Sequence, residues 1–183
     1  SRQVPFGRRV VIEAGGFALG PPKGFKRLAP GREVRLRFGY VIRCEQVHQD
    51  SAGAVTKLTC SVDRASRGGA TADGRTVAGT IHWVSLDHGV PVELRLYDRL
   101  FSDPEPDRRE NFLEALNPDS LQILEGIAEP AVAAEEADRL QFERLGYFYR
   151  DPASTAAKHV WNRIVPLKDS WAKVVAAAAE HAS

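Results

Sequence analysis

The stretch Val34-Arg35-Leu36-Arg37-Phe38-Gly39-Tyr40-Val41-Ile42-Arg43-Cys44 has the period-two alternation of a half-buried β-strand. The residues expected on its buried face are Val34, Leu36, Phe38, Tyr40, Ile42 and Cys44. The opposite face carries Arg35, Arg37, Val41 and Arg43. The pattern predicts one long strand over residues 34–44.

A second strand follows this one after a turn. Residues 50–53, Asp-Ser-Ala-Gly, are turn formers, and alternation resumes at Leu58, Cys60 and Val62, which indicates the return strand of a hairpin. Cys44 and Cys60 lie about equally far from the turn, so we expect them to face each other. Two small buried thiols are a better interpretation of this pair than a metal or redox site.

The rest of the chain predicts further short strands and little helix. The additional strands expected are Val10–Ala14, Thr76–Ser85, Val90–Tyr97, Leu121–Gly126, Leu140–Tyr149 and His159–Val165. Helical patterns are confined to Arg108–Leu116 and Ser170–His181, and residues 67–75 look like an exposed loop. We expect Trp83, Trp161 and Trp171 to pack in the core. Many short strands without βαβ alternation predict an all-β sandwich or barrel architecture with few short helices.

Composition and motifs exclude several classes of protein. The chain has 183 residues, 43% hydrophobic and 27% charged, which argues against disorder, and it has no apolar run long enough to span a membrane. Two cysteines cannot form a disulfide framework, so we expect a cytoplasmic protein. Methionine is absent even at position 1, and we therefore expect a piece of a longer protein.

No set of residues predicts catalysis or metal binding. The chain lacks the phosphate-loop and dinucleotide-binding glycine motifs, and its five histidines are scattered. Ser85, Asp87 and His88 are close in sequence, but we interpret them as part of a loop between strands, because a catalytic triad is assembled in space. The prediction is a protein with no active site and no cofactor of its own.

Charge is segregated along the chain although the net charge is only +1. Residues 1–45 carry 10 Lys/Arg and 3 Asp/Glu, residues 46–138 carry 8 and 17, and residues 139–183 carry 7 and 4. The basic loop Lys23–Arg27 leads into the strand bearing Arg35 and Arg37. Near the other end, Gln141 and Glu143 should share a strand face while Phe142 enters the core. Cations can bind phosphates, and amide and carboxylate groups can bind the edges of bases. The combination predicts binding of single-stranded RNA.

Seven segments, in order along nearly the whole chain, closely resemble the C-terminal anticodon-binding region of bacterial-type glutaminyl-tRNA synthetase. They are SRQVPF (1–6), FKRLAPGREVRLR (25–37), ADGRTVAGTIHWVS (72–85), PVELRLYDRLF (91–101), ENFLEALNPDSL (110–121), QFERLGYF (141–148) and NRIVPLKDSW (162–171). The resemblance implies two tandem antiparallel β-barrels with partial strand exchange. From it we expect a first barrel at about 31–111 and a second formed by about 1–30 with 112–183.

The resemblance also implies which residues contact RNA. Those assigned to the third anticodon base, a guanine, are Lys26, Arg27 and Arg144. Those assigned to the central uracil are Gln141 and Glu143. Those assigned to the first base and the adjoining backbone are Arg35 and Arg37.

The implied function is recognition of glutamine tRNA by a monomeric module of an ATP-dependent ligase. ATP and Mg²⁺ would be bound only by the catalytic part of the parent chain, whose motifs do not occur here, so this part alone should be inactive. Two alternatives stay open at this stage. One is the equivalent domain of an archaeal or eukaryotic-type glutamyl-tRNA synthetase, and the other is a stand-alone, non-catalytic RNA-binding β-barrel.

Overall fold

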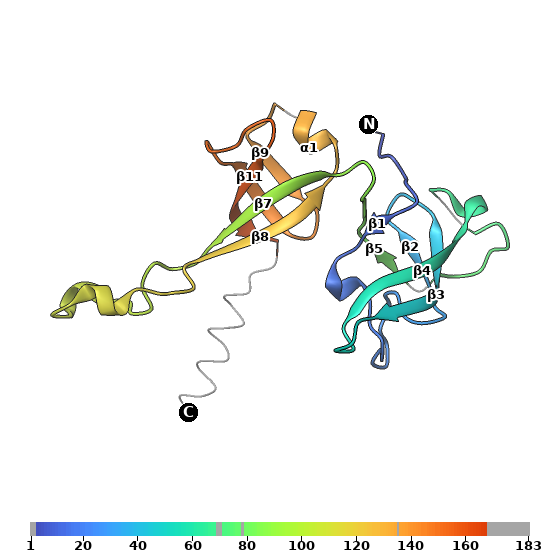
Figure 1. Cartoon of the computed structure of the whole chain (residues 1–183), viewed down its shortest axis with the longest axis horizontal. Coiled ribbons are helices and arrows are strands. Elements are labelled where there is room, and N and C mark those ends of the chain that lie inside the picture. The colour runs from blue at the N-terminus through green and yellow to red at the C-terminus, as the bar shows by residue number, and fades with distance from the viewer. Residues whose placement is uncertain (1–2, 69–70, 78, 135, 168–183) are drawn as a thin grey trace. The chain divides into compact units, whose positions relative to one another are not determined.

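The computed structural model describes residues 3–68, 71–77, 79–134 and 136–167, and the contacts divide the chain into two compact units (Figure 1). The first unit is Gln3–His88 and the second begins at Gly89. The expected segment 31–111 crosses this division, and the expected grouping of 1–30 with 112–183 differs from it. The reason is packing: Leu28, near the end of that first segment, lies in the same core cluster as Val34 and Leu36.

The first unit holds a four-stranded sheet and a two-stranded one. Its elements are β1 (Val10–Val11), the 3₁₀ helix η1 (Ala14–Gly16), β2 (Glu33–Leu36), β3 (Val41–Gln49), β4 (Val55–Asp63), the 3₁₀ helix η2 (Arg64–Ser66), β5 (Thr80–Ile81) and β6 (Val84–Ser85). The larger sheet has the order β4-β3-β2-β5, and β1 pairs with β6. The fully buried side chains of its core include Val34, Leu36, Ile81 and Leu28.

The second unit is built on a five-stranded sheet. Its elements are β7 (Val90–Tyr97), the 3₁₀ helices η3 (Pro106–Arg108) and η4 (Phe112–Ala115), β8 (Leu121–Ala128), α1 (Ala131–Ala134), β9 (Arg139–Phe142), β10 (Gly146–Arg150) and β11 (His159–Pro166). The strand order is β8-β7-β11-β10-β9. Val92, Phe148 and Trp161 form its core. The chain between β7 and β8 extends from this sheet as an arm that carries η3 and η4 (Figure 1).

The prediction of a mostly β protein with few short helices is confirmed, and so are several details. Cys44 and Cys60 are register partners in the β3–β4 hairpin and are free thiols. Burial raises the pKa of the Cys60 thiol to about 11, which makes it a poor nucleophile. Trp83 and Trp161 are buried as predicted, whereas Trp171 and the expected helix Ser170–His181 lie outside the described residues.

Three predictions from local pattern need correction. The segment 34–44 is not one strand, because β2 ends at Leu36 and the chain reverses through a tight turn into β3. Likewise 140–149 is the hairpin β9–β10. Alternation survives a tight turn, so period alone cannot reveal the reversal. Finally, the expected helix Arg108–Leu116 is replaced by the 3₁₀ helix η4 and the last residue of η3, because this arm offers little core against which a helix could bury its apolar face.

The strand pairing is also not purely antiparallel. β2 pairs in parallel with β5, and β11 pairs in parallel with β7. Both pairings join strands that are far apart in sequence, so short turns could not have indicated them. The β2–β5 pairing brings the segment around Gly79 beside β2, where Arg35 lies.

Candidate nucleic-acid interface

Arg35 lies in β2 between two buried residues. Val34 and Leu36 are fully buried, and alternation directs Arg35 to the other face. The Arg35 guanidinium Nη1 donates to the carbonyl of Ser66 at 3.3 Å, and the Arg35 amide donates to the carbonyl of Gly79 at 2.9 Å. Arg35 therefore has a fixed backbone and a half-buried side chain.

Lys26 and Arg27 precede the buried anchor Leu28. The side chain of Lys26 is exposed, while Arg27 is half-buried and donates from Nη1 to the carbonyl of Gly15 at 2.6 Å. A guanidinium carries five N–H donors, so Arg27 can hold this carbonyl and still bind a phosphate or a base edge. A Cβ at Gly79 would collide with the carbonyl of Lys26. Gly79 therefore lies against Lys26 on one side and bonds Arg35 on the other.

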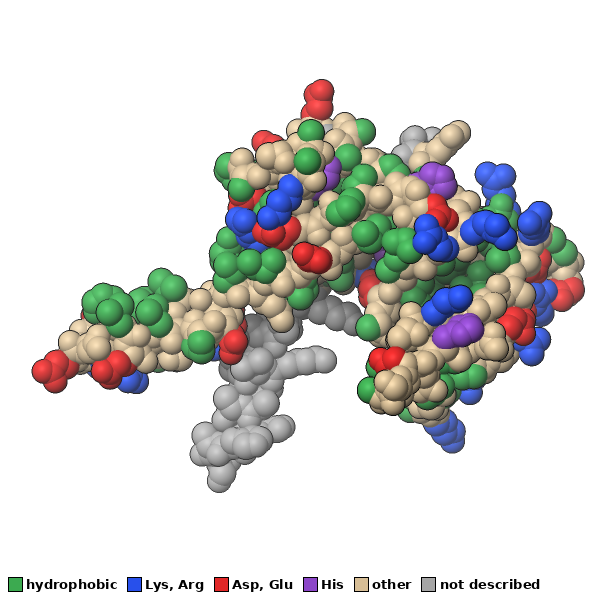
Figure 2. All heavy atoms as spheres, viewed as in Figure 1, with side chains coloured by type: hydrophobic (Ala, Val, Ile, Leu, Met, Phe, Trp, Pro, Cys, Tyr) green, Lys and Arg blue, Asp and Glu red, His purple; other side chains and the backbone are tan. Residues whose placement is uncertain are grey.

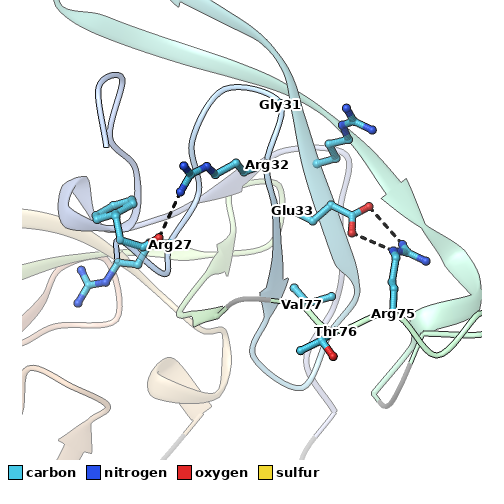
Figure 3. Close-up of a pocket in the computed structure, with 9 residues that line it drawn as sticks. Arg27, Gly31, Arg32, Glu33, Arg75, Thr76 and Val77 are labelled. Carbon is cyan, nitrogen blue, oxygen red and sulfur yellow. Dashed lines mark hydrogen bonds and ion pairs between the residues drawn. The ribbon is translucent and has the colours of Figure 1, made fainter. Parts of the chain in front are cut away.

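A hollow of about 580 Å³ opens beside Arg27 (Figure 3). It is lined by Phe25, Arg27, Gly31, Arg32, Glu33, Arg43, Arg75, Thr76 and Val77. Arg32 donates from Nη1 to the carbonyl of Phe25 at 3.4 Å, which ties the two ends of the loop together. Apart from the Glu33–Arg75 ion pair, the charged side chains of the lining are the cations Arg27, Arg32 and Arg43, and they lie with one aromatic ring, Phe25, a combination suited to an unstacked nucleotide.

Arg75, predicted to lie in an exposed loop, is the centre of an ion-pair cluster. It contacts Glu33 at 2.9 Å, Asp63 at 2.8 Å and Asp73 at 2.8 Å, and Figure 3 shows its approach to Glu33. These hydrogen bonds, first of all the one to Glu33, raise the pKa of the guanidinium above its ordinary value. Asp73 is a local partner, but Glu33 and Asp63 come from other strands, so the sequence alone did not mark Arg75 as the centre of a cluster. Its charge is used to hold the 71–77 segment on the sheet, not to attract RNA.

The turn between β2 and β3 differs most from the sequence prediction. Arg37 is exposed, as expected, but Phe38 is 83% exposed although alternation placed it on the buried face. Phe38 has φ +57°, and its ring lies 4.8 Å from the Arg37 guanidinium carbon. The chain reverses at these residues, which turns the ring into solvent.

In the second unit the predicted contacts gather at the β9–β10 hairpin. Gln141 is exposed on β9, while Phe142 enters the core and stacks on Phe148 with ring centroids 4.7 Å apart, as predicted. Glu143 and Arg144, however, lie in the turn, and Arg144 has φ +67°. The expectation that Gln141 and Glu143 share a strand face is therefore wrong, because the strand ends at Phe142.

The seven predicted residues fall into two groups by unit. The first unit contains Lys26, Arg27, Arg35 and Arg37, and the second contains Gln141, Glu143 and Arg144. On the face seen in Figure 2, several Lys and Arg side chains of the first unit lie on the surface among apolar and acidic ones. Each group lies at a loop or turn next to buried strand residues, which is the usual position for recognition residues.

Other combinations of polar residues have different uses. Ser85 Oγ lies 3.0 Å from His88 Nδ1, but Asp87 is engaged by Arg9 at 2.7 Å, which leaves the three without the geometry of a triad. Over the described ranges, no three His, Cys, Asp or Glu residues are grouped so that they could hold a metal ion. Within those same ranges, no helix combines the length and hydropathy needed to cross a membrane.

Comparison with known proteins identifies the family. Two family models, both described as "tRNA synthetases class I (E and Q), anti-codon binding domain", match residues 1–63 and 80–151. Glutamine–tRNA ligases of Nitrobacter winogradskyi and Nitrobacter hamburgensis are 51% and 49% identical over 97% of this chain. That of Serratia proteamaculans is 47% identical over 95%. The chain spans about a third of the length of these curated relatives, 32% in each case.

These matches follow the order of the segments on which the resemblance rests. All seven predicted residues lie within the two matched ranges, four of them in 1–63 and three in 80–151. The chain therefore belongs to the class I tRNA synthetases for glutamate and glutamine, as part of their anticodon-binding region.

Proposed function

We propose that this chain reads the anticodon of glutamine tRNA for a parent glutamine–tRNA ligase that is about three times as long. The observation that carries the proposal is the pair of anticodon-binding matches on the two units, together with ligase relatives at about half identity. ATP and Mg²⁺ would serve the catalytic part of that parent. We further propose that the protein acts in the cytoplasm as a monomer.

Each unit would supply a different part of the recognition. In the first unit, Lys26 and Arg27 would bind the third base, a guanine, whose O6 and N7 accept hydrogen bonds. Arg35 and Arg37 would bind the first base and the adjoining backbone. Support comes from Gly79, which contacts the backbones of both Lys26 and Arg35 and so fixes the spacing of the two pairs.

In the second unit, the β9–β10 hairpin would read the central uracil. The N3–H of uracil needs an acceptor, which Glu143 offers, and its carbonyls need donors, which the Gln141 amide offers. Arg144 would add a second cation at the third base. The stacking of Phe142 in the core supports this role, because it anchors the residue between Gln141 and Glu143.

We also propose that the two units are tandem β-barrels with partial exchange of strands. The support for the barrels is that a parallel pairing in each unit joins strands far apart in sequence, β2 with β5 and β7 with β11, as a compact closed sheet would require. Isolated bridges such as Phe17 with Leu28 and Pro30 with Cys44 extend the pairing of the first unit.

The test is binding of the 183-residue chain to a glutamine anticodon stem-loop and to the same loop with its central uracil replaced. Gln141→Ala or Glu143→Ala should reduce the preference for uracil by about 1–3 kcal/mol, the range for direct base readout. Gln122, an exposed glutamine on β8 of the same sheet, provides the control Gln122→Ala, which should bind like the wild type. Equal weakening toward all central bases would contradict the assignment.

A glutamate-specific domain is the second candidate, because the matching family models cover both enzymes. The two amino acids share a central uracil in the anticodon but differ at the third base, which is guanine for glutamine and cytosine for glutamate. A third stem-loop with cytosine at that position separates the candidates. Tighter binding to the cytosine loop would assign the chain to glutamate.

A further inference from the structure

Phe38 combines two features that a folded protein rarely gives an aromatic residue. It is 83% exposed, and its backbone has φ +57°, in the left-handed region. Single exposed apolar side chains are common, but a bulky residue other than glycine at positive φ is an outlier. Glycine or asparagine would adopt this conformation at lower cost. The Phe38 ring is thus exposed to solvent, and its backbone has a conformation that a phenylalanine residue disfavours.

The surrounding contacts fix the turn in this form. The Gly39 amide donates to the Leu36 carbonyl at 2.8 Å, and the Leu36 amide donates to the Tyr40 carbonyl at 2.9 Å. The indole of Trp83 donates to the Arg37 carbonyl at 2.9 Å, and the Gly68 amide donates to the Gly39 carbonyl at 3.0 Å. The hydrogen bonds around the turn therefore maintain a strained backbone conformation. Residues in such conformations are concentrated at active sites and ligand-binding sites.

The chemistry beside the ring points to its ligand. The Arg37 guanidinium carbon lies 4.8 Å from the ring centroid, so a cation covers one face while most of the residue stays open to solvent. A flat ring next to an arginine is the combination with which proteins bind single-stranded nucleic acid, because the ring stacks on a base while the arginine binds the phosphate. Apolar protein partners require a larger continuous patch, whereas the side chain that lies over the Phe38 ring is the charged Arg37.

We propose that Phe38 is a stacking platform for one unpaired nucleobase of the bound RNA, on the side of the anticodon that Arg37 contacts. The inference rests on the proposed function and deepens it. The platform adds binding energy without selecting a base by its edge, since every base has a π face. It would therefore complement the base-specific contacts of Lys26, Arg27 and the β9–β10 hairpin.

The test uses the 183-residue chain and a glutamine anticodon stem-loop. Phe38→Asn removes the ring and suits the left-handed backbone, so the variant should unfold at the same or higher urea concentration than the wild type. Its affinity should nevertheless fall about 5- to 150-fold, the range measured for loss of one stacked base. Phe38→Tyr keeps the ring and should bind like the wild type.

The control and the position of the base come from two further measurements. Phe112 is 53% exposed on the arm of the second unit, and Phe112→Asn should leave affinity unchanged. A set of stem-loops, each lacking one unpaired base, then locates the contact. For the base that stacks on Phe38, the loss of binding free energy from deleting the base and that from Phe38→Asn should not be additive, because both changes remove the same interaction.

The outcomes separate this inference from the function on which it rests. If the wild type binds and Phe38→Asn binds equally well, the platform is refuted and the proposed function stands. A loss in affinity that adds fully to every base deletion would also refute the platform. If the wild type fails to bind the stem-loop, the proposed function fails and the inference fails with it.

Discussion

The turns of the hairpins β2–β3 and β9–β10 belong to different units but share an unusual backbone conformation. Each places a residue other than glycine at positive φ directly after a predicted RNA contact: Phe38 after Arg37 and Arg144 after Glu143. They differ in what the turn presents, which is an exposed aromatic ring in the first unit and a cation in the second. The backbone conformation is thus a means of projecting a side chain, and the side chain determines which part of a nucleotide it can bind.

Each unit also has a glycine that lies against a backbone carbonyl near the proposed RNA contacts. A Cβ at Gly79 would collide with the carbonyl of Lys26, and a Cβ at Gly146 would collide with that of Val165. In the first unit this contact acts on a residue proposed to bind RNA. In the second, Gly146 is the first residue of β10 in the β9–β10 hairpin, and the contact is with the neighbouring strand β11. Substituting each glycine tests whether the two proposed binding regions are independent.

The largest effect is expected for Gly146→Ala. Gly146 has φ +153°, a conformation that side chains disfavour, and the added methyl would also press on backbone atoms. We expect the free energy of unfolding to fall by about 3 kcal/mol or more, as strain and overpacking combine. Discrimination at the central uracil should weaken while that at the first base is retained. Urea denaturation and stem-loop binding measure these changes, and wild-type stability would contradict the close contact.

A smaller loss is expected for Gly79→Ala, where the close contact acts without an unusual φ. Overpacking against the Lys26 carbonyl should lower the free energy of unfolding by about 1–3 kcal/mol. Binding should weaken at the third base, while discrimination at the central uracil, which Gly146→Ala should impair, is retained. Gly20→Ala is the matched control, because a Cβ there would meet open space. If Gly79→Ala impaired discrimination at the central uracil, which only the hairpin is proposed to read, the two regions would not be independent.

The smallest effect concerns acid stability and compares one carboxylate from each unit. In the second unit, the hydrogen bond from Lys158, followed by that from Arg95, lowers the pKa of Glu93 below its ordinary 4.5. In the first unit Arg9 lowers the pKa of Asp87, but Arg9 is 71% exposed, so water and salt screen that pair more strongly.

A lowered pKa stabilises the fold above the unfolded value, and this contribution is lost as pH falls through the folded value. The stability gap between the wild type and Glu93→Gln should therefore be present at pH 7 and shrink below about pH 4.5. The gap for Asp87→Asn should be smaller and should decrease further in salt. Urea midpoints between pH 7 and pH 3 measure both gaps. A Glu93 gap that stays constant over this range would show that the carboxylate charge contributes nothing.

Much of the fold was predictable wherever the determining contacts are local. The β3–β4 hairpin follows from alternation on both sides of a turn, and it places Cys44 opposite Cys60 as expected. The inward position of Phe142 and the outward position of Gln141 follow from the same rule. Assignment of the seven residues to anticodon recognition came from resemblance, because alternation alone cannot distinguish an RNA-binding face from a solvated one.

The amino-acid sequence by itself determined the β-rich class, the segregation of charge and the membership in a family of anticodon-binding domains. Only the tertiary structure decided where strands reverse, which strands pair in parallel, and that Gly79 touches Lys26. It likewise placed Arg75 among three carboxylates and turned Phe38 into solvent. The physical reason is range: side-chain alternation records only which face a residue occupies, whereas these features arise from contacts between segments that the chain brings together when it folds.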